Sequence, residues 1–85
     1  MKQSHFREEV LVIIRAIPLG TTLTYKQVAE CTSSPRAYRA VGAILRMNFD
    51  PAVPCHRVIR SDGTLGGYNR GVRRKRELLK RERAI

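Results

Sequence analysis

The feature that most restricts the fold is a pair of short helical patterns joined by a tight polar turn. In TTLTYKQVAEC, Thr24 and the glutamine three residues later form a capping-box pattern, which predicts a helix over residues 25–31. In the TSSP that follows, Ser34 can cap a helix and Pro35 suits a first helical position, so a second helix is expected over residues 35–46. Two short helices separated in this way indicate a helix-turn-helix.

The second predicted helix has an apolar side and an arginine side. Very small residues lie between its arginines, on or near the same face. Small side chains let a helix approach another backbone closely, and arginines supply charge, as binding in a nucleic-acid groove requires. The alternative is a solvated face that is rich in alanine for helix propensity alone. The residues of this helix that we expect to contact DNA are Arg36, Arg39, Ala40, Ala43 and Arg46.

Two further elements are expected on either side of this pair. Apolar residues at helical spacing predict a first helix over residues 4–17, with one face toward the core. In PCHRVIRSDGTLGGY, a short extended stretch, a turn at residues 61–63 and a second short strand or loop predict a β-hairpin. A hairpin that follows a helix-turn-helix suggests a wing.

The last predicted helix, over residues 71–83, is strongly basic. Val72, Leu78 and Leu79 are expected on its inner edge, and its lysines and arginines, Lys75 among them, on the outside. The expected fold is therefore a mostly α, winged helix-turn-helix-like single domain over residues 1–85, with a short β-hairpin wing.

The charge of the chain indicates an anionic partner. It carries 17 Lys and Arg against 7 acidic residues, a net charge of +10. A small domain this basic most often binds a polyanion, with nucleic acid the first candidate and an anionic membrane surface the second. A solvated basic surface without a partner is the third possibility. Neither a signal-peptide pattern nor a long apolar run occurs, so a reducing, cytoplasmic setting is expected, nucleoid-associated if prokaryotic.

The two cysteines differ in their surroundings. Cys31, at the end of a short helix, is expected to be a buried small residue, and no Cys/His spacing indicates a metal site. Cys55 lies directly before His56, a base that could activate the thiol. On an extended strand, adjacent residues point to opposite faces, so His56 would reach Cys55 only across a sharp turn or through a water. By itself the pair fits a nucleophile or a small core residue.

PCHRV, the SDG turn, the GGY step and a final helix that contains LL closely resemble the active-site segment of the O6-alkylguanine-DNA alkyltransferases, also called methylated-DNA–protein-cysteine methyltransferases. TTLTYKQVAE and SPRAYRAVGAILRMN are similar to that family's helix-turn-helix and recognition helix. The resemblance covers about residues 6–82 and concerns the C-terminal, cysteine-bearing domain of the family. It implies winged-helix architecture, no cofactor, no metal, and single-turnover repair of alkylated DNA after base flipping.

The resemblance also implies roles for the residues that match the family's reactive site. Cys55 matches the alkyl-accepting cysteine, and His56 the histidine that deprotonates it through a water. Glu82 matches the glutamate that orients this histidine, and Asn48 the asparagine that braces the cysteine-bearing turn. Tyr25 matches a tyrosine that contacts the 3′ phosphate and is a candidate proton donor to the departing base.

Other matches concern DNA and the base pocket. Arg39 matches the arginine that fills the space left by the flipped guanine, and Arg46 a structural or phosphate-facing arginine. Val58, Tyr68 and Asn69 match the residues that line, or lie beside, the base pocket.

The implied partner is double-stranded DNA that contains O6-alkylguanine. The protein is expected to bind this DNA as a monomer, and no membrane partner is expected. Tyr38 departs from the family, which usually has a small residue beside the arginine. Alkyltransferase-like proteins, which bind the lesion without transfer and engage excision-repair proteins, have Trp or Ala in place of the cysteine. Because this chain keeps Cys55, transfer is the first hypothesis, lesion binding the second and a plain winged-helix DNA-binding module the third.

Overall fold

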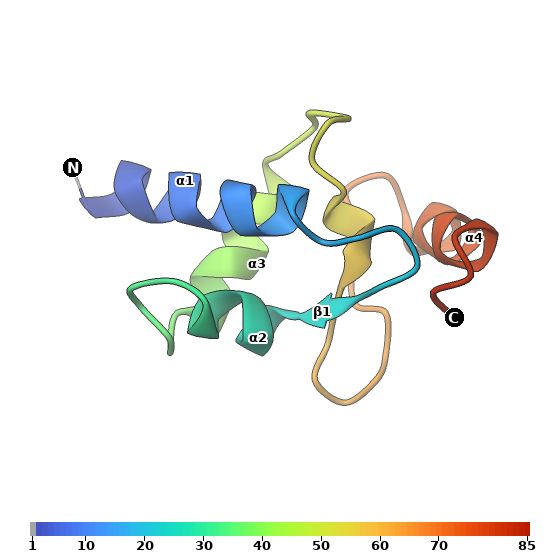
Figure 1. The fold of residues 1–85 in the computed structure, drawn as a ribbon. Helices are drawn as coiled ribbons and strands as arrows, with labels where there is room; N and C mark the ends of the chain where they lie inside the picture. Colours follow the sequence, from blue (N-terminus) through green and yellow to red (C-terminus); the bar gives the residue numbers. More distant parts are fainter. Residues whose placement is uncertain (1) are drawn as a thin grey trace.

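The computed structural model describes residues 2–85, with side chains from residue 5 onward. None of the helices in this range is long and apolar enough to cross a membrane. The elements in order are α1 (Lys2–Arg15), β1 (Leu23–Thr24), α2 (Tyr25–Glu30), α3 (Tyr38–Arg46), η1 (Cys55–Arg57), β2 (Val58–Ile59) and α4 (Val72–Arg81). The helix α1 contacts α2 and α3, whereas α4 lies at the other end of the molecule beside the 3-10 turn η1 (Figure 1). The mostly helical fold class is confirmed.

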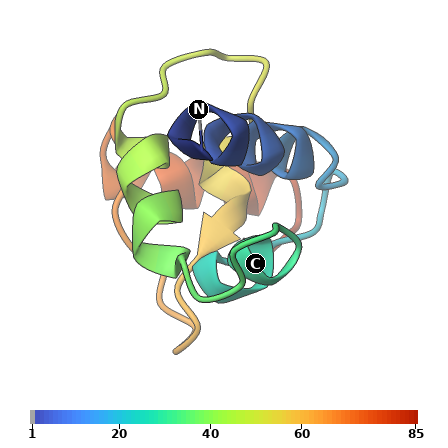
Figure 2. The same ribbon diagram turned by 90° about the vertical axis from the view of Figure 1, so that its left-hand side faces the viewer.

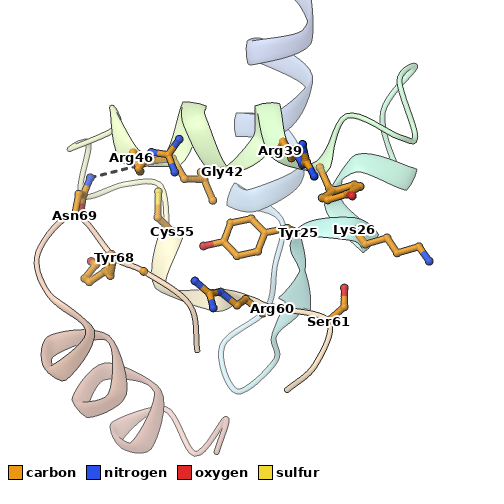
Figure 3. Close-up of a pocket in the computed structure, with 13 residues that line it drawn as sticks. Tyr25, Lys26, Arg39, Gly42, Arg46, Cys55, Arg60, Ser61, Tyr68 and Asn69 are labelled. Carbon is orange, nitrogen blue, oxygen red and sulfur yellow. Dashed lines mark hydrogen bonds between the residues drawn. The ribbon is translucent and has the colours of Figure 1, made fainter. Parts of the chain in front are cut away.

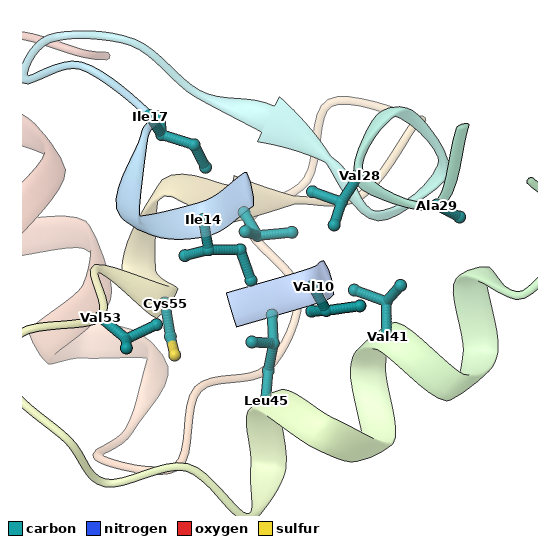
Figure 4. Close-up of a cluster of buried hydrophobic side chains, with 10 residues drawn as sticks. Val10, Ile14, Ile17, Val28, Ala29, Val41, Leu45, Val53 and Cys55 are labelled. Atoms are coloured by element: carbon teal, nitrogen blue, oxygen red, sulfur yellow. The ribbon is translucent and has the colours of Figure 1, made fainter. Parts of the chain in front are cut away.

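The core lies where α1, α2 and α3 converge on η1 and β2, which occupy the middle of the fold in Figure 2. Val10 and Ile14 of α1, spaced one helical turn apart, are fully buried among side chains of α2 and α3 (Figure 4). The apolar stripe predicted for the first helix therefore faces the core. Cys55 belongs to the same cluster, so the chain that carries it is held by packing on three helices.

The start of α2 follows the predicted capping box. The backbone N–H of Gln27 donates to Thr24 Oγ1 at 3.0 Å, and the backbone N–H of Thr24 donates to Gln27 Oε1 at 2.8 Å. The end of α2 differs from expectation, because Cys31 is exposed rather than buried. It follows the last turn of the helix, beyond the face that Val28 and Ala29 bury.

The start of α3 differs from the prediction. Residues 34–37 form a turn in which the backbone N–H of Ala37 donates to the carbonyl of Ser34 at 3.0 Å, and the helix begins only at Tyr38. Ser34 therefore caps no helix, and Arg36 lies in the turn rather than on the helix. Glu9 of α1 fixes this turn, since its Oε2 accepts hydrogen bonds from the N–H and hydroxyl of Ser33. The helix-turn-helix is thus present with a longer turn.

The predicted hairpin forms its turn but not its second strand. Arg60 donates its N–H to the carbonyl of Thr64 at 3.0 Å, and Asp62 Oδ1 accepts from the N–H and hydroxyl of Thr64. The chain then turns away from β2 at Gly66 and forms no second strand. Gly66 has a φ of 72°, which few residues other than glycine adopt. Within residues 2–85, β2 pairs instead with β1, in parallel and in the register Leu23↔Val58 and Thr24↔Ile59. The wing is a loop over residues 60–69.

The last helix, α4, packs differently from the prediction at two positions. Val72, expected inside, is 48% exposed, and Lys75, expected outside, is fully buried beside Leu79. Lys75 and Leu79 are four residues apart, so both lie on the face that α4 turns toward η1. Glu82 follows directly as the C-cap residue, and Arg83 has the positive φ of 59° that often ends a helix.

Candidate active site

Cys55 lies in a tight turn, not on the extended stretch that the sequence suggested. Pro54 precedes it with a φ of −78°, and the N–H of Arg57 donates to the Pro54 carbonyl at 3.0 Å, which closes the 3-10 turn. Cys55 is 6% exposed and borders a cavity. On a strand, the side chains of Cys55 and His56 would point to opposite faces of the sheet. In the observed turn this restriction does not apply.

Asn48 holds the sulfur of Cys55. Its Nδ2 donates to Cys55 Sγ at 3.1 Å, and both side chains are buried. The carbonyl of Asn48 in turn accepts a hydrogen bond from Asn69 Nδ2, which also reaches the carbonyl of Leu45. Burial raises the pKa of the Cys55 thiol, and the Asn48 hydrogen bond with the nearby positive charges of Arg70 and Lys75 opposes that rise only in part. The resting thiol is therefore protonated near neutral pH, and reaction requires a base.

The base beside Cys55 is held from its far side by a carboxylate. His56 Nε2 lies 2.7 Å from Glu82 Oε2. Arg57 donates its Nε–H to Glu82 Oε1 at 2.9 Å and an Nη2–H to Oε2 at 3.1 Å, and its Nη1–H reaches the carbonyl of Ile17. The hydrogen bonds of Arg57 and His56 lower the pKa of Glu82, so this carboxylate is ionised. With Nε2 turned to Glu82, Nδ1 is the ring nitrogen that remains to accept a proton.

An open cavity of about 890 Å³ lies between α2, α3 and the loop over residues 60–69. Figure 3 shows the Tyr25 ring in its middle, with Cys55 and Tyr68 on one side and Arg39 and Lys26 on the other. The hydroxyl of Tyr25 points toward the side on which Cys55 lies. The cavity is lined by Tyr25, Lys26, Tyr38, Arg39, Gly42, Leu45, Arg46, Cys55, Arg60, Ser61, Gly67, Tyr68 and Asn69.

Two glycines flank the ring of Tyr25 in this cavity. A Cβ at Gly42 would lie 3.9 Å from Tyr25 Cε1, and one at Gly66 would lie 3.5 Å from Cε2 and only 3.2 Å from Cγ of Arg60. Burial raises the pKa of Tyr25, with the positive charge of Arg60 acting in the opposite direction. The phenol is consequently protonated and can donate a hydrogen bond to a molecule in the cavity.

A second cavity, of about 170 Å³, is bordered by both Cys55 and His56, together with Asn48, Tyr68 and Asn69. It exceeds the space that one water needs, and its polar lining offers hydrogen-bond partners. A small molecule such as water can therefore contact the thiol and the imidazole from one place. Among the described residues, no group of three or more His, Cys, Asp and Glu side chains is arranged to hold a metal ion.

The structure brings most of the predicted site residues together. Cys55, Tyr25, Arg39, Arg46, Tyr68 and Asn69 line the larger cavity, and Asn48, His56 and Glu82 are connected to Cys55 or its neighbour. Arg36, Ala40 and Ala43 are exposed beside the cavity without lining it. Val58 belongs to the buried core, and its side chain does not line the cavity. Tyr38 lines the cavity and is 46% exposed.

Three residues of the site are not predicted from the sequence. Arg57 is part of PCHRV, but nothing in its spacing reveals the contact with Glu82, 25 residues away. Lys75 is expected on the outside of its helix, although its position four residues before Leu79 is a signal for the inner face. Arg60 enters the cavity because its loop folds back toward Tyr25, which no local pattern predicts.

Comparison with known proteins gives one family match over almost the whole chain. The family described as "6-O-methylguanine DNA methyltransferase, DNA binding domain" matches residues 5–84. The chain is 48% identical over 80 residues to a methylated-DNA–protein-cysteine methyltransferase of Methanothermobacter thermautotrophicus, covering 93% of this chain and 44% of the relative. It is 46% identical over 78 residues to the bifunctional transcriptional activator/DNA repair enzyme Ada of Escherichia coli, covering 91% of this chain and 22% of that protein. The chain thus spans less than half the length of these curated relatives.

Two solved structures resemble the fold closely. The Mycobacterium tuberculosis OGT in complex with DNA superposes with a TM-score of 0.87 at 41% identity, covering 93% of this chain and 49% of that one. The Schizosaccharomyces pombe Atl1 in complex with damaged DNA containing O6-carboxymethylguanine gives the same TM-score of 0.87 at 30% identity, covering 96% of this chain and 79% of that one.

Proposed function

The chain belongs to the 6-O-methylguanine DNA methyltransferase family, over its DNA-binding domain, and on that premise we propose that it repairs DNA by moving an alkyl group from O6-alkylguanine to Cys55 in one irreversible turnover. We propose also that it corresponds to the C-terminal, cysteine-bearing part of the longer relatives. The observation that carries the proposal is the position of Cys55 on the wall of an open cavity, next to a histidine held by an ionised carboxylate.

Activation of the thiol follows from its surroundings. Burial favours the neutral thiol, so a proton has to leave Cys55 when the substrate is in place. Cys55 Sγ is hydrogen-bonded to Asn48 and not to His56, whereas both Cys55 and His56 border the smaller cavity. A water there would pass the thiol proton to Nδ1 of His56, and Glu82 would stabilise the resulting imidazolium through Nε2.

The transfer is a single displacement. The sulfur forms a bond to the alkyl carbon as the bond between that carbon and O6 breaks, and the electron pair of the broken bond stays with guanine. The departing base takes up one proton, for which the protonated hydroxyl of Tyr25 is the donor we propose. Tyr25 then regains a proton from water, and His56 releases the thiol proton to water. Overall, a thiol and O6-alkylguanine give a thioether and guanine. The thioether has no reverse path, so each molecule reacts once.

Access to O6 requires the base to leave the duplex. Extrusion of a base costs a few kcal/mol, and an enzyme offsets this cost with contacts made to the flipped base and to the gap. The cavity of about 890 Å³ is large enough for a nucleobase, and Arg39 stands on its rim at the start of α3. We propose that α3 lies against DNA and that Arg39 fills the position the guanine leaves. The net charge of +10 supports a polyanionic partner.

Intact-mass measurement after mixing with a duplex that contains O6-methylguanine tests the proposal. The expected result is a stoichiometric gain of one methyl group in place of one hydrogen, located on Cys55 by peptide mapping. Cys55→Ser provides the control and should gain nothing. A folded sample that binds the duplex and keeps its original mass would exclude transfer.

Lesion binding without transfer is the second candidate, favoured by the likeness to Atl1 over 79% of that shorter chain. It predicts stronger binding to a duplex with O6-alkylguanine than to an unmodified one, with no covalent product and with excision-repair proteins as downstream partners. Equal affinity for the two duplexes would exclude this candidate. A plain winged-helix DNA-binding module would likewise show no preference for the lesion.

A further inference from the structure

Lys75 is a buried cation that the proposed chemistry does not use. Its side chain is fully buried between α4 and the middle of the fold. Nζ donates to the carbonyl of Val58 at 2.6 Å and to the carbonyl of Gly67 at 3.2 Å, and it lies 5.8 Å from the centroid of the Tyr25 ring. Both hydrogen-bond partners are backbone carbonyls, so the contacts of Nζ neutralise none of its charge.

A lysine in this environment is costly compared with an apolar residue. Removal of an ammonium from water is unfavourable unless it gains a close partner of opposite charge. The same face of α4 buries Leu79 without such a cost. The unfavourable burial of Lys75 therefore indicates a role that methionine or leucine could not fulfil. That role is the donation of hydrogen bonds to two carbonyls at once.

Those two carbonyls belong to different parts of the site. Val58 is in β2, which is anchored in the core and paired with β1. Gly67 is in the second half of the loop over residues 60–69, which contributes Arg60, Ser61, Gly67, Tyr68 and Asn69 to the larger cavity. Figure 3 shows Tyr25 between this loop, at Arg60, and α3. Lys75 thus joins the wall of the cavity that faces α3 to the rigid centre of the fold.

The loop depends on this link because of its composition. Its first part is closed by the bond from Arg60 to Thr64, and its end is fixed by Asn69 on the carbonyls of Leu45 and Asn48. Between these points lie two glycines in sequence, which have many accessible backbone conformations. The contact from Lys75 to Gly67 O falls in that interval.

We propose that Lys75 is a positioning residue that fastens the glycine-rich wall of the cavity to β2 and so holds the space for the flipped base open at a fixed width. The role in base binding rests on the function proposed above, whereas the role in holding the loop stands on the geometry alone. Lys75 need not touch the base to do this, because it acts through the backbone of Gly67.

The lowered pKa of Lys75 is compatible with this role. Burial lowers the pKa of Lys75 to about 8, while the charge of Cys55 raises it and that of Arg60 lowers it. A neutral amine still has two N–H groups, enough for both carbonyls, so the link persists on either side of that pH. The hydrogen bonds are stronger when the group is charged.

Hydrogen–deuterium exchange followed by mass spectrometry tests the link without any assumption about activity. Lys75→Met has a similar length and no donor, and Lys80→Met, exposed on the same helix, is the matched control. For Lys75→Met, the amides of Arg60 and Gly71, which donate to the loop carbonyls of Thr64 and Tyr68, should exchange at least about tenfold faster, with those of α1 unchanged. Unaltered exchange of these two amides in a folded Lys75→Met protein would overturn the proposal. If that variant does not fold, Lys75→Gln, which is too short to reach both carbonyls, is measured in its place.

DNA binding in a Cys55→Ser background tests the consequence for the base. Addition of Lys75→Met should weaken binding to an O6-methylguanine duplex about tenfold and leave binding to the unmodified duplex within twofold, because the phosphate contacts that we propose for α3 lie outside this loop. Equal weakening for both duplexes would contradict the positioning role. If the Cys55→Ser parent shows no preference for the lesion, the role of Lys75 in base binding fails, while the exchange experiment still decides whether Lys75 holds the loop and the intact-mass measurement decides the proposed transfer.

Discussion

His56 Nε2 and Glu82 Oε2 are 2.7 Å apart, and the carboxylate that binds the imidazole also receives two hydrogen bonds from Arg57. Glu82 therefore has two partners: its charge can stabilise a protonated His56, and Arg57 fixes its position. Arg57 also reaches the carbonyl of Ile17, after the end of α1, so the three side chains join the C-cap of α4 to the first helix. The position of the catalytic base His56 thus depends on the contacts of its neighbour Arg57, which reach residues 25 and 40 positions away in sequence.

Glu82→Gln should slow alkyl transfer strongly. The amide retains the size of the side chain but cannot stabilise an imidazolium, so proton transfer from Cys55 is less favourable. General-base catalysis contributes about 10²–10⁴-fold, and we expect a loss of at least about tenfold in the single-turnover rate with O6-methylguanine DNA. Rapid-quench mass spectrometry measures the rate, with Glu77→Gln on the exposed side of α4 as control. A rate equal to that of the parent would exclude Glu82 from the relay.

Arg57→Met should destabilise the fold in a pH-dependent way. The folded-state pKa of Glu82 lies below its ordinary value of 4.5, mainly because of Arg57. This contribution is therefore present above about pH 4.5 and is lost as the pH falls through the folded-state pKa. Charged hydrogen bonds contribute about 1.5–3 kcal/mol, so the variant should lose about that much at pH 7 and progressively less in acid. Urea unfolding from pH 3 to 7 measures the difference. A deficit that is constant with pH would contradict it.

Local patterns predicted the parts of the fold that depend on local interactions. The capping box at Thr24 is satisfied by residues three apart, and the stripe of the first helix by residues one turn apart. The start of α3 was predicted three residues early, because a Ser-Pro pair fits both a helix start and the turn observed at residues 34–37. The missing hairpin strand has a tertiary cause, since β2 pairs with β1 across 35 residues of sequence.

The residues of the candidate site also fall into two groups, those that the sequence indicated and those whose contacts depend on tertiary packing. Cys55 and His56 are adjacent in PCHRV, and the family resemblance implies that Asn48, seven residues earlier, braces the cysteine-bearing turn. The contacts of Arg57 and Lys75 depend on how α4 packs against η1, and periodicity gives only the face of a helix and not its partner. The basic character of α4 obscured the inward position of Lys75, because a lysine among arginines is ordinarily solvated.

Asn48→Ala should make Cys55 less reactive in the absence of DNA. The hydrogen bond from Asn48 Nδ2 lowers the pKa of the buried thiol, so its loss raises that pKa further. At pH 7 a smaller thiolate fraction reacts, and the rate with a small aromatic disulfide should fall about three- to tenfold, as about 1 kcal/mol of lost stabilisation implies. The pH profile of that reaction should move to higher pH. An unchanged profile would show that Asn48 does not act on the thiol.

Lys75 should make folding stability rise between about pH 8 and 10.5. Its folded-state pKa of about 8 is below the ordinary 10.5, so in this interval the unfolded chain binds more protons than the folded protein. Tyr25 and Cys55 contact the same region, and their raised pKa values act in the opposite direction, which is why the comparison is made with a variant. The free energy of unfolding of the parent minus that of Lys75→Met should increase with pH in this interval, by as much as about 1 kcal/mol per pH unit. A decrease of this value with pH would contradict a buried ammonium.

Arg39→Ala should separate DNA repair from thiol chemistry. Arg39 lies at the rim of the cavity on the side away from Cys55, so its loss should leave the reaction of Cys55 with a small disulfide unchanged. Transfer from O6-methylguanine in a duplex should fall at least about tenfold, because nothing then occupies the place of the flipped base. Transfer from the free base O6-benzylguanine, which needs no flipping, should be almost unaffected. Arg7→Ala, an exposed arginine of α1, controls for net charge. If the duplex and free-base reactions slow equally, Arg39 acts on the cavity and not on the DNA.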